Sequence, residues 1–199
     1  MDSEFVISSK RKDANKNAVK ILEAAKKIFS QKGLETTIEE IALEANVGVG
    51  TIYRRFNNKD QLANAVANEV ISEIYQEQVD ILKSNQPAID KVYKIFACYG
   101  KITQKYGEIH PMIVELLVTD KGDTDFKQTF LSNLKQLYSE AIEHGQKEGV
   151  FREGDPRIYE IFLLNMINPQ MVNQMAEIIP LENTPYFLAD LALNGILKK

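Results

Sequence analysis

The chain of 199 residues is poor in several features that mark particular protein classes. It contains one cysteine, Cys98, so an internal disulfide framework is excluded. No stretch approaches the roughly 18 consecutive apolar residues of a membrane-spanning helix. The first residues also lack the ordered basic, apolar and cleavage regions of a signal peptide. We therefore expect a cytoplasmic protein with no membrane segment.

Residues suited to catalysis or metal binding are also scarce. Neither of the two histidines, His110 and His144, belongs to a metal-binding sequence pattern. The glycine pair Gly48 and Gly50 lacks the preceding strand and the third glycine of a phosphate-binding loop. An enzyme would have to use Cys98 with His110 as nucleophile and base. We predict that the protein is not an enzyme and holds neither a metal nor a cofactor.

Charge is distributed unevenly along the chain, although the net charge of the whole is −4. Residues 1–60 carry eleven basic and nine acidic side chains, a net charge of +2, which leaves −6 for the remainder. A polyanionic partner should therefore bind the N-terminal third. The same charges also suit the solvated faces of helices, so charge alone does not identify a partner.

Strand signals are missing, because no segment alternates apolar and polar residues and no hairpin dipeptide separates apolar runs. Apolar residues instead recur at helical spacing, which predicts an all-α protein. We predict a flexible tail over 1–12, a three-helix domain over 13–60 and a larger helical bundle over 61–199, joined through one long helix. Beyond that long helix, which should end near Ser84, helical segments are expected near 88–106, 111–119, 124–147, 157–168, 170–179 and 185–198.

Residues 37–56 predict a helix-turn-helix. The segment opens on a Thr-x-x-Glu capping box at Thr37, and the helical pattern breaks at Asn46. Ile52 and Phe56, four residues apart, then place one face of a second helix in the core. Such a pair of helices presents the second one to the major groove of DNA.

The opposite face of this second helix carries residues suited to DNA. At about 100° per residue, Gly50 and Arg54 point most nearly outward when Ile52 points inward. Glycine lets the backbone approach a partner, and arginine can donate two hydrogen bonds to a guanine edge. Thr51 and Tyr53 flank this pair, and the Tyr53 hydroxyl suits a contact with phosphate.

Two further basic residues are expected to contact phosphate groups. Arg55 lies nearer the inward side of the same helix, so it is more suited to a phosphate than to a base. Lys59 stands in the first turn of the next helix, beside free backbone N–H groups that favour an anion.

This part of the chain resembles the DNA-binding domain of the tetracycline-repressor (TetR) family over about residues 14–64. Members of that family typically have a pair of threonines, an Ile-Ala pair, the pattern Gly-Thr-x-Tyr and an aromatic residue before the fourth helix. They also have a lysine that is followed by an acidic residue and a leucine. The matching residues here are Thr36, Thr37, Ile41, Ala42, Gly50, Thr51, Tyr53, Phe56, Lys59, Asp60 and Leu62. The resemblance implies a homodimeric transcriptional regulator, usually a repressor. It also implies that a small molecule binds in the C-terminal domain and releases the protein from its DNA operator.

The resemblance also implies roles for individual residues. Thr37, Tyr53 and Lys59 would contact phosphates, while Gly50, Thr51 and Arg54 would lie on the base-facing side. The full set of predicted DNA-binding residues is Thr37, Gly48, Gly50, Thr51, Tyr53, Arg54, Arg55 and Lys59. Residues 10–12, Lys-Arg-Lys, either add phosphate or minor-groove contacts or have no role.

Two positions depart from the family pattern. Asn46 stands where a turn glycine is usual, but asparagine tolerates the left-handed conformation that the turn needs. Gly48 stands where a serine often caps the recognition helix. The cap should be weaker by a few tenths of a kcal/mol, and one hydroxyl contact with phosphate is absent.

The remainder of the chain is expected to supply a dimer interface and a ligand pocket. Family members commonly dimerise through their last two long helices, and the interface residues predicted here are Ile158, Phe162, Phe187, Leu188, Leu191 and Ile196. Aromatic, thioether and amide groups suited to a pocket are Tyr93, Phe96, Tyr99, Met112, Phe130, Tyr138, Phe162, Asn165 and Met166. Both sets also suit an ordinary helical core.

The sequence thus predicts a DNA-binding regulator whose partners are a double-stranded DNA operator, a small-molecule effector and a second copy of the chain. The alternative is an all-α binding module of the same fold that acts mainly through a protein partner. The acidic C-terminal two-thirds of the chain leaves that alternative open. The salt dependence of DNA binding separates the two.

Overall fold

The computed structural model describes residues 2–119, 122, 124–166, 174–175, 177–180 and 182–198, without the side chains of residues 2–15, 99, 102–104, 117 and 118. Within these residues the regular elements are helices, and the one extended pairing is an isolated bridge between Phe151 and Leu197. The all-α prediction is confirmed. No helix in the described part of the chain is both long and apolar enough to cross a membrane.

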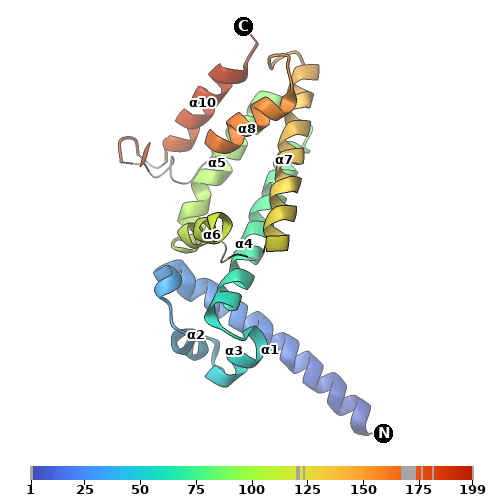
Figure 1. Cartoon of the computed structure of the whole chain (residues 1–199), viewed down its shortest axis with the longest axis vertical. Coiled ribbons are helices and arrows are strands. Elements are labelled where there is room, and N and C mark those ends of the chain that lie inside the picture. The colour runs from blue at the N-terminus through green and yellow to red at the C-terminus, as the bar shows by residue number, and fades with distance from the viewer. Residues whose placement is uncertain are drawn as a thin grey trace. The chain divides into compact units, whose positions relative to one another are not determined.

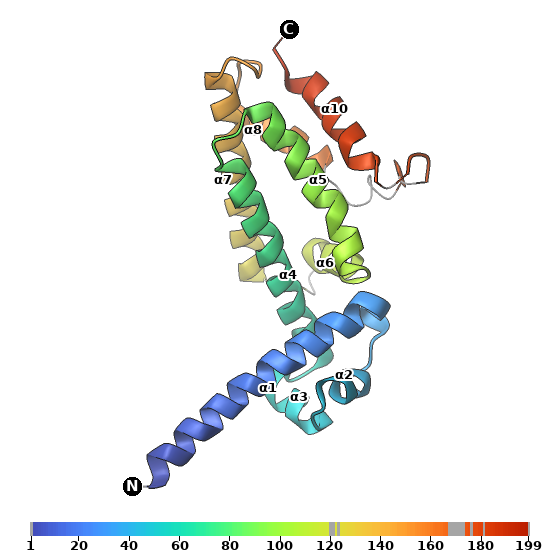
Figure 2. The same ribbon diagram turned by 180° about the vertical axis from the view of Figure 1, so that it is seen from behind.

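Figures 1 and 2 show the helices from opposite sides. In chain order they are α1 (Asp2–Lys32), the 3-10 helix η1 (Gly33–Glu35), α2 (Ile38–Ala45), α3 (Val49–Phe56), α4 (Lys59–Leu82), α5 (Ala88–Tyr106), α6 (Ile109–Val118), α7 (Thr124–Lys147), α8 (Pro156–Met166) and α10 (Thr184–Ile196). The limits of α5 and α7 coincide with the predicted ones. Half of the segment predicted as a helix over 170–179 lies outside the described residues, and so does Pro169.

Helix α1 differs from the prediction at its N-terminal end. It begins at Asp2 rather than near Ala14, so the residues predicted as a flexible tail are helical from Asp2 onward. Residues 2–32 contain neither glycine nor proline, the two residues that most strongly disfavour a helix. Nothing in the local sequence therefore forces the helix to begin later.

The chain divides into two compact units, which are described separately. The first unit comprises Met1–Val70 and Tyr106–Gly122, and the second comprises Ile71–Lys105 and Asp123–Lys199. The sequence, in contrast, predicts one boundary near residue 60. Helix α6 belongs to the first unit because the residues before it dock on the end of α1.

That docking depends on Gly107 and Glu108. The Glu108 backbone N–H donates to the Ser30 carbonyl at 3.0 Å. Gly107 has a φ of +51°, and a Cβ at this position would lie 2.4 Å from the same carbonyl oxygen. Only glycine fits such a close approach in this backbone conformation.

The core of the first unit fixes the orientation of α3. Ile52 of α3, Ile41 of α2 and Phe29 of α1 are all fully buried. Burying each side chain of this size contributes about 1.5–3 kcal/mol. Because α3 has eight residues and is too short to be stable alone, this packing is what holds its opposite face toward the surface.

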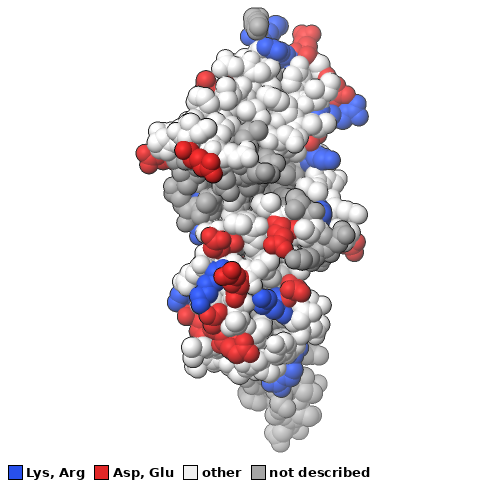
Figure 3. All heavy atoms as spheres, turned by 60° about the vertical axis from the view of Figure 1, so that its left-hand side comes forward, with Lys and Arg blue, Asp and Glu red and all other residues white. Residues whose placement is uncertain are grey.

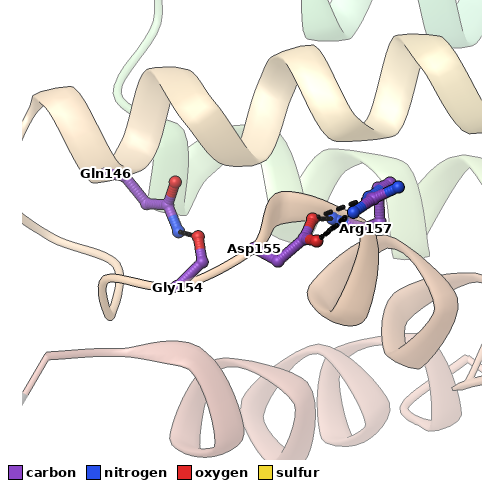
Figure 4. Close-up of polar contacts among 4 residues, drawn as sticks. All are labelled: Gln146, Gly154, Asp155 and Arg157. Carbon is purple, nitrogen blue, oxygen red and sulfur yellow. Dashed lines mark hydrogen bonds and ion pairs between the residues drawn. The ribbon is translucent and has the colours of Figure 1, made fainter.

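In the second unit, the connection between α7 and α8 fixes where α8 begins (Figure 4). The Gln146 amide donates to the Gly154 carbonyl at 3.1 Å. The Asp155 carboxylate accepts from the Arg157 backbone N–H at 3.0 Å and from its guanidinium Nε at 2.9 Å. The Arg157 guanidinium, and then its backbone N–H, lower the pKa of Asp155 to about 2, so this carboxylate is ionised and caps the helix.

Candidate nucleic-acid interface

The first helix of the pair, α2, begins at the predicted capping box. The Thr37 hydroxyl accepts from the Glu40 backbone N–H at 3.3 Å, and the Glu40 carboxylate accepts from the Thr37 backbone N–H at 2.9 Å. Lys32 pairs with the same carboxylate. The Lys32 ammonium, and then the Thr37 backbone N–H, hold the pKa of Glu40 below its ordinary value. The start of α2 is therefore set by local hydrogen bonds that the sequence predicts.

The turn between α2 and α3 is made by Asn46 and the residues after it. Asn46 adopts the expected left-handed conformation, with φ 52° and ψ 51°. The backbone N–H groups of Asn46 and Val47 donate to the last carbonyls of α2, which completes the end of that helix. Gly48 is the N-cap of α3 and supplies no side-chain cap. Its carbonyl accepts from the Thr51 N–H at 2.8 Å.

The exposed side of α3 carries Gly50, Thr51, Tyr53 and Arg54, which we call the recognition face. Gly50, Tyr53 and Arg54 are exposed, and Thr51 is half-buried. A Cβ added at Gly50 would meet no atom of the protein within 4 Å. The face is therefore open at the point where a partner would approach the backbone most closely.

Arg54 lies along this face. Its Nε donates to the Gly50 carbonyl at 3.1 Å, and its Nη2 donates to the Thr51 hydroxyl at 3.3 Å. The three residues that the sequence places on the base-facing side are thus adjacent in space. Both hydrogen bonds are exposed, and such bonds contribute only about 1 kcal/mol each. The guanidinium can leave them for a stronger bidentate acceptor such as a guanine edge.

The residues predicted to contact phosphate lie in different surroundings. Thr37 is exposed at the start of α2, and Arg55 is exposed on α3 rather than turned toward the inward side. Lys59 is half-buried, and its ammonium donates to the Leu34 carbonyl at 2.7 Å. Lys59 therefore has a structural bond between α4 and η1 that the sequence does not reveal. Two of its three N–H donors are left for a phosphate.

Several basic side chains of the first unit form ion pairs with carboxylates, whereas the two arginines of α3 do not among the described residues. Lys27 of α1 pairs with Glu44 at 2.7 Å, and Lys32 pairs with the carboxylate of the capping box. Acidic and basic side chains accordingly lie interspersed over the first unit on the surface shown in Figure 3. No described carboxylate pairs with Arg54 or Arg55. These two cations are available for an external anion.

We expect the substitution Gly50→Ala to stabilise the protein and to weaken DNA binding. Alanine is favoured over glycine in a helix by up to about 1 kcal/mol, and its Cβ has room at this position. The same methyl group would hold the α3 backbone away from a base pair. Thermal unfolding and DNA affinity, measured on the same preparation, check both effects. Unchanged affinity in a folded variant would show that DNA does not approach Gly50.

The helices of the second unit enclose a cavity of about 20 Å³, which has room for about one water molecule. Of the predicted pocket residues, Phe96 and Tyr138 line it. Met112 does not, because it is buried in α6 of the first unit. Phe162 and Asn165 are exposed on α8, and the Asn165 amide donates to a carbonyl one turn earlier. These three residues therefore do not line this cavity, and their assignment to a ligand pocket stays a prediction.

The other predicted pocket residues do not line this cavity. Tyr93 and Met166 are partly buried and pack against the core of the second unit. Phe130 is half-buried, and its ring meets that of Tyr75 edge to face at 6.0 Å. The side chain of Tyr99 lies outside the described residues.

Exposed apolar side chains gather on α8 and α10, and we call this set the apolar face. Its members are Ile158, Ile161, Phe162, Tyr186, Phe187 and Leu191, with exposed fractions of 38–65%. Phe162 also contacts α10, because a Cβ at Gly195 would lie 3.0 Å from its ring. Figure 3 shows that much of the surface over α10 carries no charged side chain.

Two predicted interface residues are absent from this face. Leu188 and Ile196 are each 1% exposed, because they point into the core of their own unit. Ile161 and Tyr186 lie on this face but are not among the predicted interface residues. The spacing Ile158, Ile161, Phe162 is the signal that could have found Ile161, since residues three and four apart share one side of a helix.

The residues that an enzyme would need are not activated. Cys98 is buried, and burial together with the Glu77 carboxylate raises the pKa of its thiol to about 12. His110 is also buried, and burial lowers its pKa. Among the described residues, no group of His, Cys, Asp and Glu is arranged to hold a metal ion.

We expect Cys98 in the folded protein to resist alkylation by iodoacetamide at pH 7–8, because the thiolate is the reactive form. The same thiol should react rapidly once the chain is unfolded in guanidinium chloride. Mass spectrometry of the two samples measures the difference. Rapid labelling of the folded protein would contradict the buried, protonated thiol.

Comparison with known proteins supports the geometry of the first unit. Residues 21–66 match the model of the family described as bacterial regulatory proteins, tetR family. These residues run from the middle of α1 into α4 and include the whole of α2, the turn and α3.

Similar proteins extend the match along most of the chain. The HTH-type transcriptional regulator YhgD of Bacillus subtilis, itself uncharacterized, is 31% identical over 73% of this chain and 78% of its own. The regulator FadR of Bacillus subtilis, solved in complex with stearoyl-CoA, has a TM-score of 0.70 at 18% identity, covering 90% of this chain and 99% of its own. SmeT, the repressor of the multidrug efflux pump SmeDEF of Stenotrophomonas maltophilia, has a TM-score of 0.67 at 21% identity and covers 90% of both chains.

Proposed function

The chain belongs to the TetR family of transcriptional regulators, which are DNA-binding proteins and not enzymes, and we propose that it represses transcription in the cytoplasm by binding a palindromic operator as a homodimer. The observation that carries this proposal is the recognition face. Gly50, Thr51 and Arg54 are adjacent and open, and no carboxylate pairs with Arg54 among the described residues. A helix with these groups on its exposed side suits insertion into the major groove.

The proposed homodimer forms through the apolar face of α8 and α10. A solvent-exposed patch of this kind is unfavourable in an isolated protomer and is typical of a protein interface. A dimer with two-fold symmetry would present two copies of α3 to one side of the DNA. The two half-sites of the operator should then lie about one helical turn, or ~34–36 Å, apart.

The proposed switch is a small molecule that binds in the second unit. FadR, which has a similar fold, was solved in complex with stearoyl-CoA, which supports a small-molecule effector for this chain as well. In our proposal the effector favours a conformation in which the two recognition helices have the wrong separation for the operator. A coupling free energy of ~1–3 kcal/mol between the two sites is enough for such a switch.

Selection of bound duplexes from a random DNA pool tests the central proposal. We expect the purified protein to enrich a palindrome, and its affinity to fall steeply between ~50 and 200 mM salt, because phosphate contacts release counterions. Failure to enrich any sequence, with and without cell extract as a source of effector, would contradict the DNA-binding proposal. It would favour the module that acts through a protein partner.

A further inference from the structure

The inner side of α8 carries a carboxylate where an apolar side chain is expected. Helix α8 packs against α7 and α10 in the second unit (Figure 1). At about 100° per residue, Glu160 points in the opposite direction from Ile158 and Phe162 of the apolar face. It lies three residues before the buried Leu163, so both side chains share the side of α8 that faces the core.

Glu160 is buried to an extent that is unusual for a glutamate. It is 4% exposed, whereas glutamate is almost never fully buried unless it is paired. Its Oε1 atom is enclosed by the protein and has no hydrogen-bond partner. No ion pair among the described residues includes this carboxylate. A buried charge without a partner is unfavourable for folding.

The charged groups around Glu160 do not neutralise it. The Lys135 ammonium of α7 acts on the carboxylate, but the Lys135 side chain is exposed. Arg157, one turn earlier in α8, is engaged with Asp155. Among the described residues, α10 contributes no charge that acts on Glu160. Burial therefore raises the pKa of the Glu160 carboxyl, and Lys135 opposes this only in part.

This raised pKa determines how stability should depend on pH. A carboxyl whose pKa is higher in the folded chain than in the unfolded chain binds its proton more tightly when folded. The ionised form therefore lowers stability at a pH above the folded value, and this loss disappears as the pH falls toward 4.5, the ordinary value of a glutamate. Acidification should thus tighten the packing of α8 on α7.

We propose that Glu160 makes the assembly of this protein sensitive to protons, because its neutral carboxyl allows α8 to pack fully and its ionisation loosens the helix. The effect reaches the interface because Ile158, Ile161 and Phe162 of the apolar face lie on the same helix. The inference rests on the proposed homodimer and adds the proton as a ligand that strengthens it. Operator binding, which depends on the dimer, should accordingly be tighter in acid than at neutral pH.

Unfolding of the full-length protein between about pH 8 and pH 5 tests the effect on stability. The native protein is compared with Glu160→Gln, which keeps the size of the side chain and cannot ionise. We expect the ratio of their unfolding equilibrium constants, native over variant, to decrease as the pH falls. The decrease can reach ~10-fold per pH unit, the limit for one proton. A ratio that stays constant over this range would overturn the proposal.

Two further variants make this experiment decisive. Glu160→Leu also cannot ionise, and its ratio should show the same pH dependence where the glutamine amide is poorly accommodated. Loss of the native fold in both variants would assign the carboxylate a stabilising partner and would also overturn the proposal. Glu153→Gln is the matched control, since it removes an exposed glutamate just before the same helix. Its ratio should not change with pH.

Sedimentation of the same proteins measures the effect on assembly. The dimer dissociation constant of the native protein should decrease at least ~10-fold between about pH 8 and pH 5, because each dimer contains two such carboxyls. That of Glu160→Gln should change much less, since only the net charge common to both proteins still varies. An equal response of the two proteins would refute the link to assembly.

These measurements can fail separately from the proposed function. Unfolding is measured without DNA, so a constant ratio would leave the operator and dimer proposals intact. Failure to select a palindrome, or a dimer that survives a charge placed on the apolar face, would leave the pH dependence of stability through Glu160 unaffected.

Discussion

Replacing Phe187 with aspartate is expected to separate the proposed homodimer into protomers and to weaken operator binding by roughly a hundredfold or more. Phe187 is 46% exposed on the apolar face, so the change should leave the protomer core intact. In a two-fold interface the new carboxylate would occur twice. Each copy would lose its hydration shell without gaining an ion-pair or hydrogen-bond partner. Such a change costs several kcal/mol per buried charge.

The loss of DNA binding follows from the loss of the dimer. Two linked recognition helices bind two half-sites with the second contact made intramolecular, whereas a protomer must bind each half-site independently. Sedimentation velocity measures the assembly, and titration of a labelled operator measures the affinity. Circular dichroism confirms that the variant retains its helices.

The control for this experiment is Leu131→Asp. Leu131 is 38% exposed on α7, a helix that contributes no residue to the apolar face, and the substitution introduces the same charge in place of an apolar side chain. We expect it to remain dimeric and to bind the operator normally. If Phe187→Asp also remained a dimer at micromolar concentration, the apolar face would not be the interface.

Arg54→Ala is expected to weaken binding to the selected operator by ~1–3 kcal/mol for each half-site and to relax the preference for one base pair in each. Two half-sites together correspond to a decrease of roughly 30-fold or more. The reason is that, among the described residues, the Arg54 guanidinium hydrogen-bonds only to Gly50 and Thr51 in the free protein, so it can turn to a guanine edge. Repeating the duplex selection with the variant measures the lost preference directly.

Arg55→Ala is the matched comparison, since it removes the neighbouring exposed arginine of the same helix. We expect it to weaken binding to all duplexes alike and to reduce the salt dependence by about one phosphate contact per protomer. The two arginines are thus expected to differ in kind as well as in magnitude. A uniform decrease on every sequence for Arg54→Ala would assign Arg54 to phosphate and not to a base.

Apart from the start of α1, most helix limits and caps could be predicted from the sequence because they depend on neighbours within four residues. The capping box at Thr37 and the left-handed Asn46 are both local patterns, and in the structure the Asn58 side chain caps α4 in the same local way by accepting from the Gln61 N–H at 2.8 Å. The outward direction of Gly50 also followed from helical periodicity once Ile52 was assigned to the core. These features require no knowledge of distant parts of the chain.

Tertiary structure, in contrast, decided which side of each later helix is buried and which is exposed. Helix α10 is apolar nearly all round, so its sequence alone cannot tell that Leu188 and Ile196 point inward while Phe187 and Leu191 remain exposed. The answer depends on which side its neighbours cover. For the same reason the predicted pocket combined residues of two units.

Some polar contacts also could not be predicted from the sequence. The bond from Lys59 to the Leu34 carbonyl joins residues 25 positions apart. A charged residue is assigned to the surface by default, and only the packed structure shows where that rule is broken. The sequence by itself determined the family, the helices and the recognition face, since these are encoded by local patterns. Tertiary structure decided the apolar face and the hydrogen bond between Lys59 and η1, since both depend on which distant segments meet.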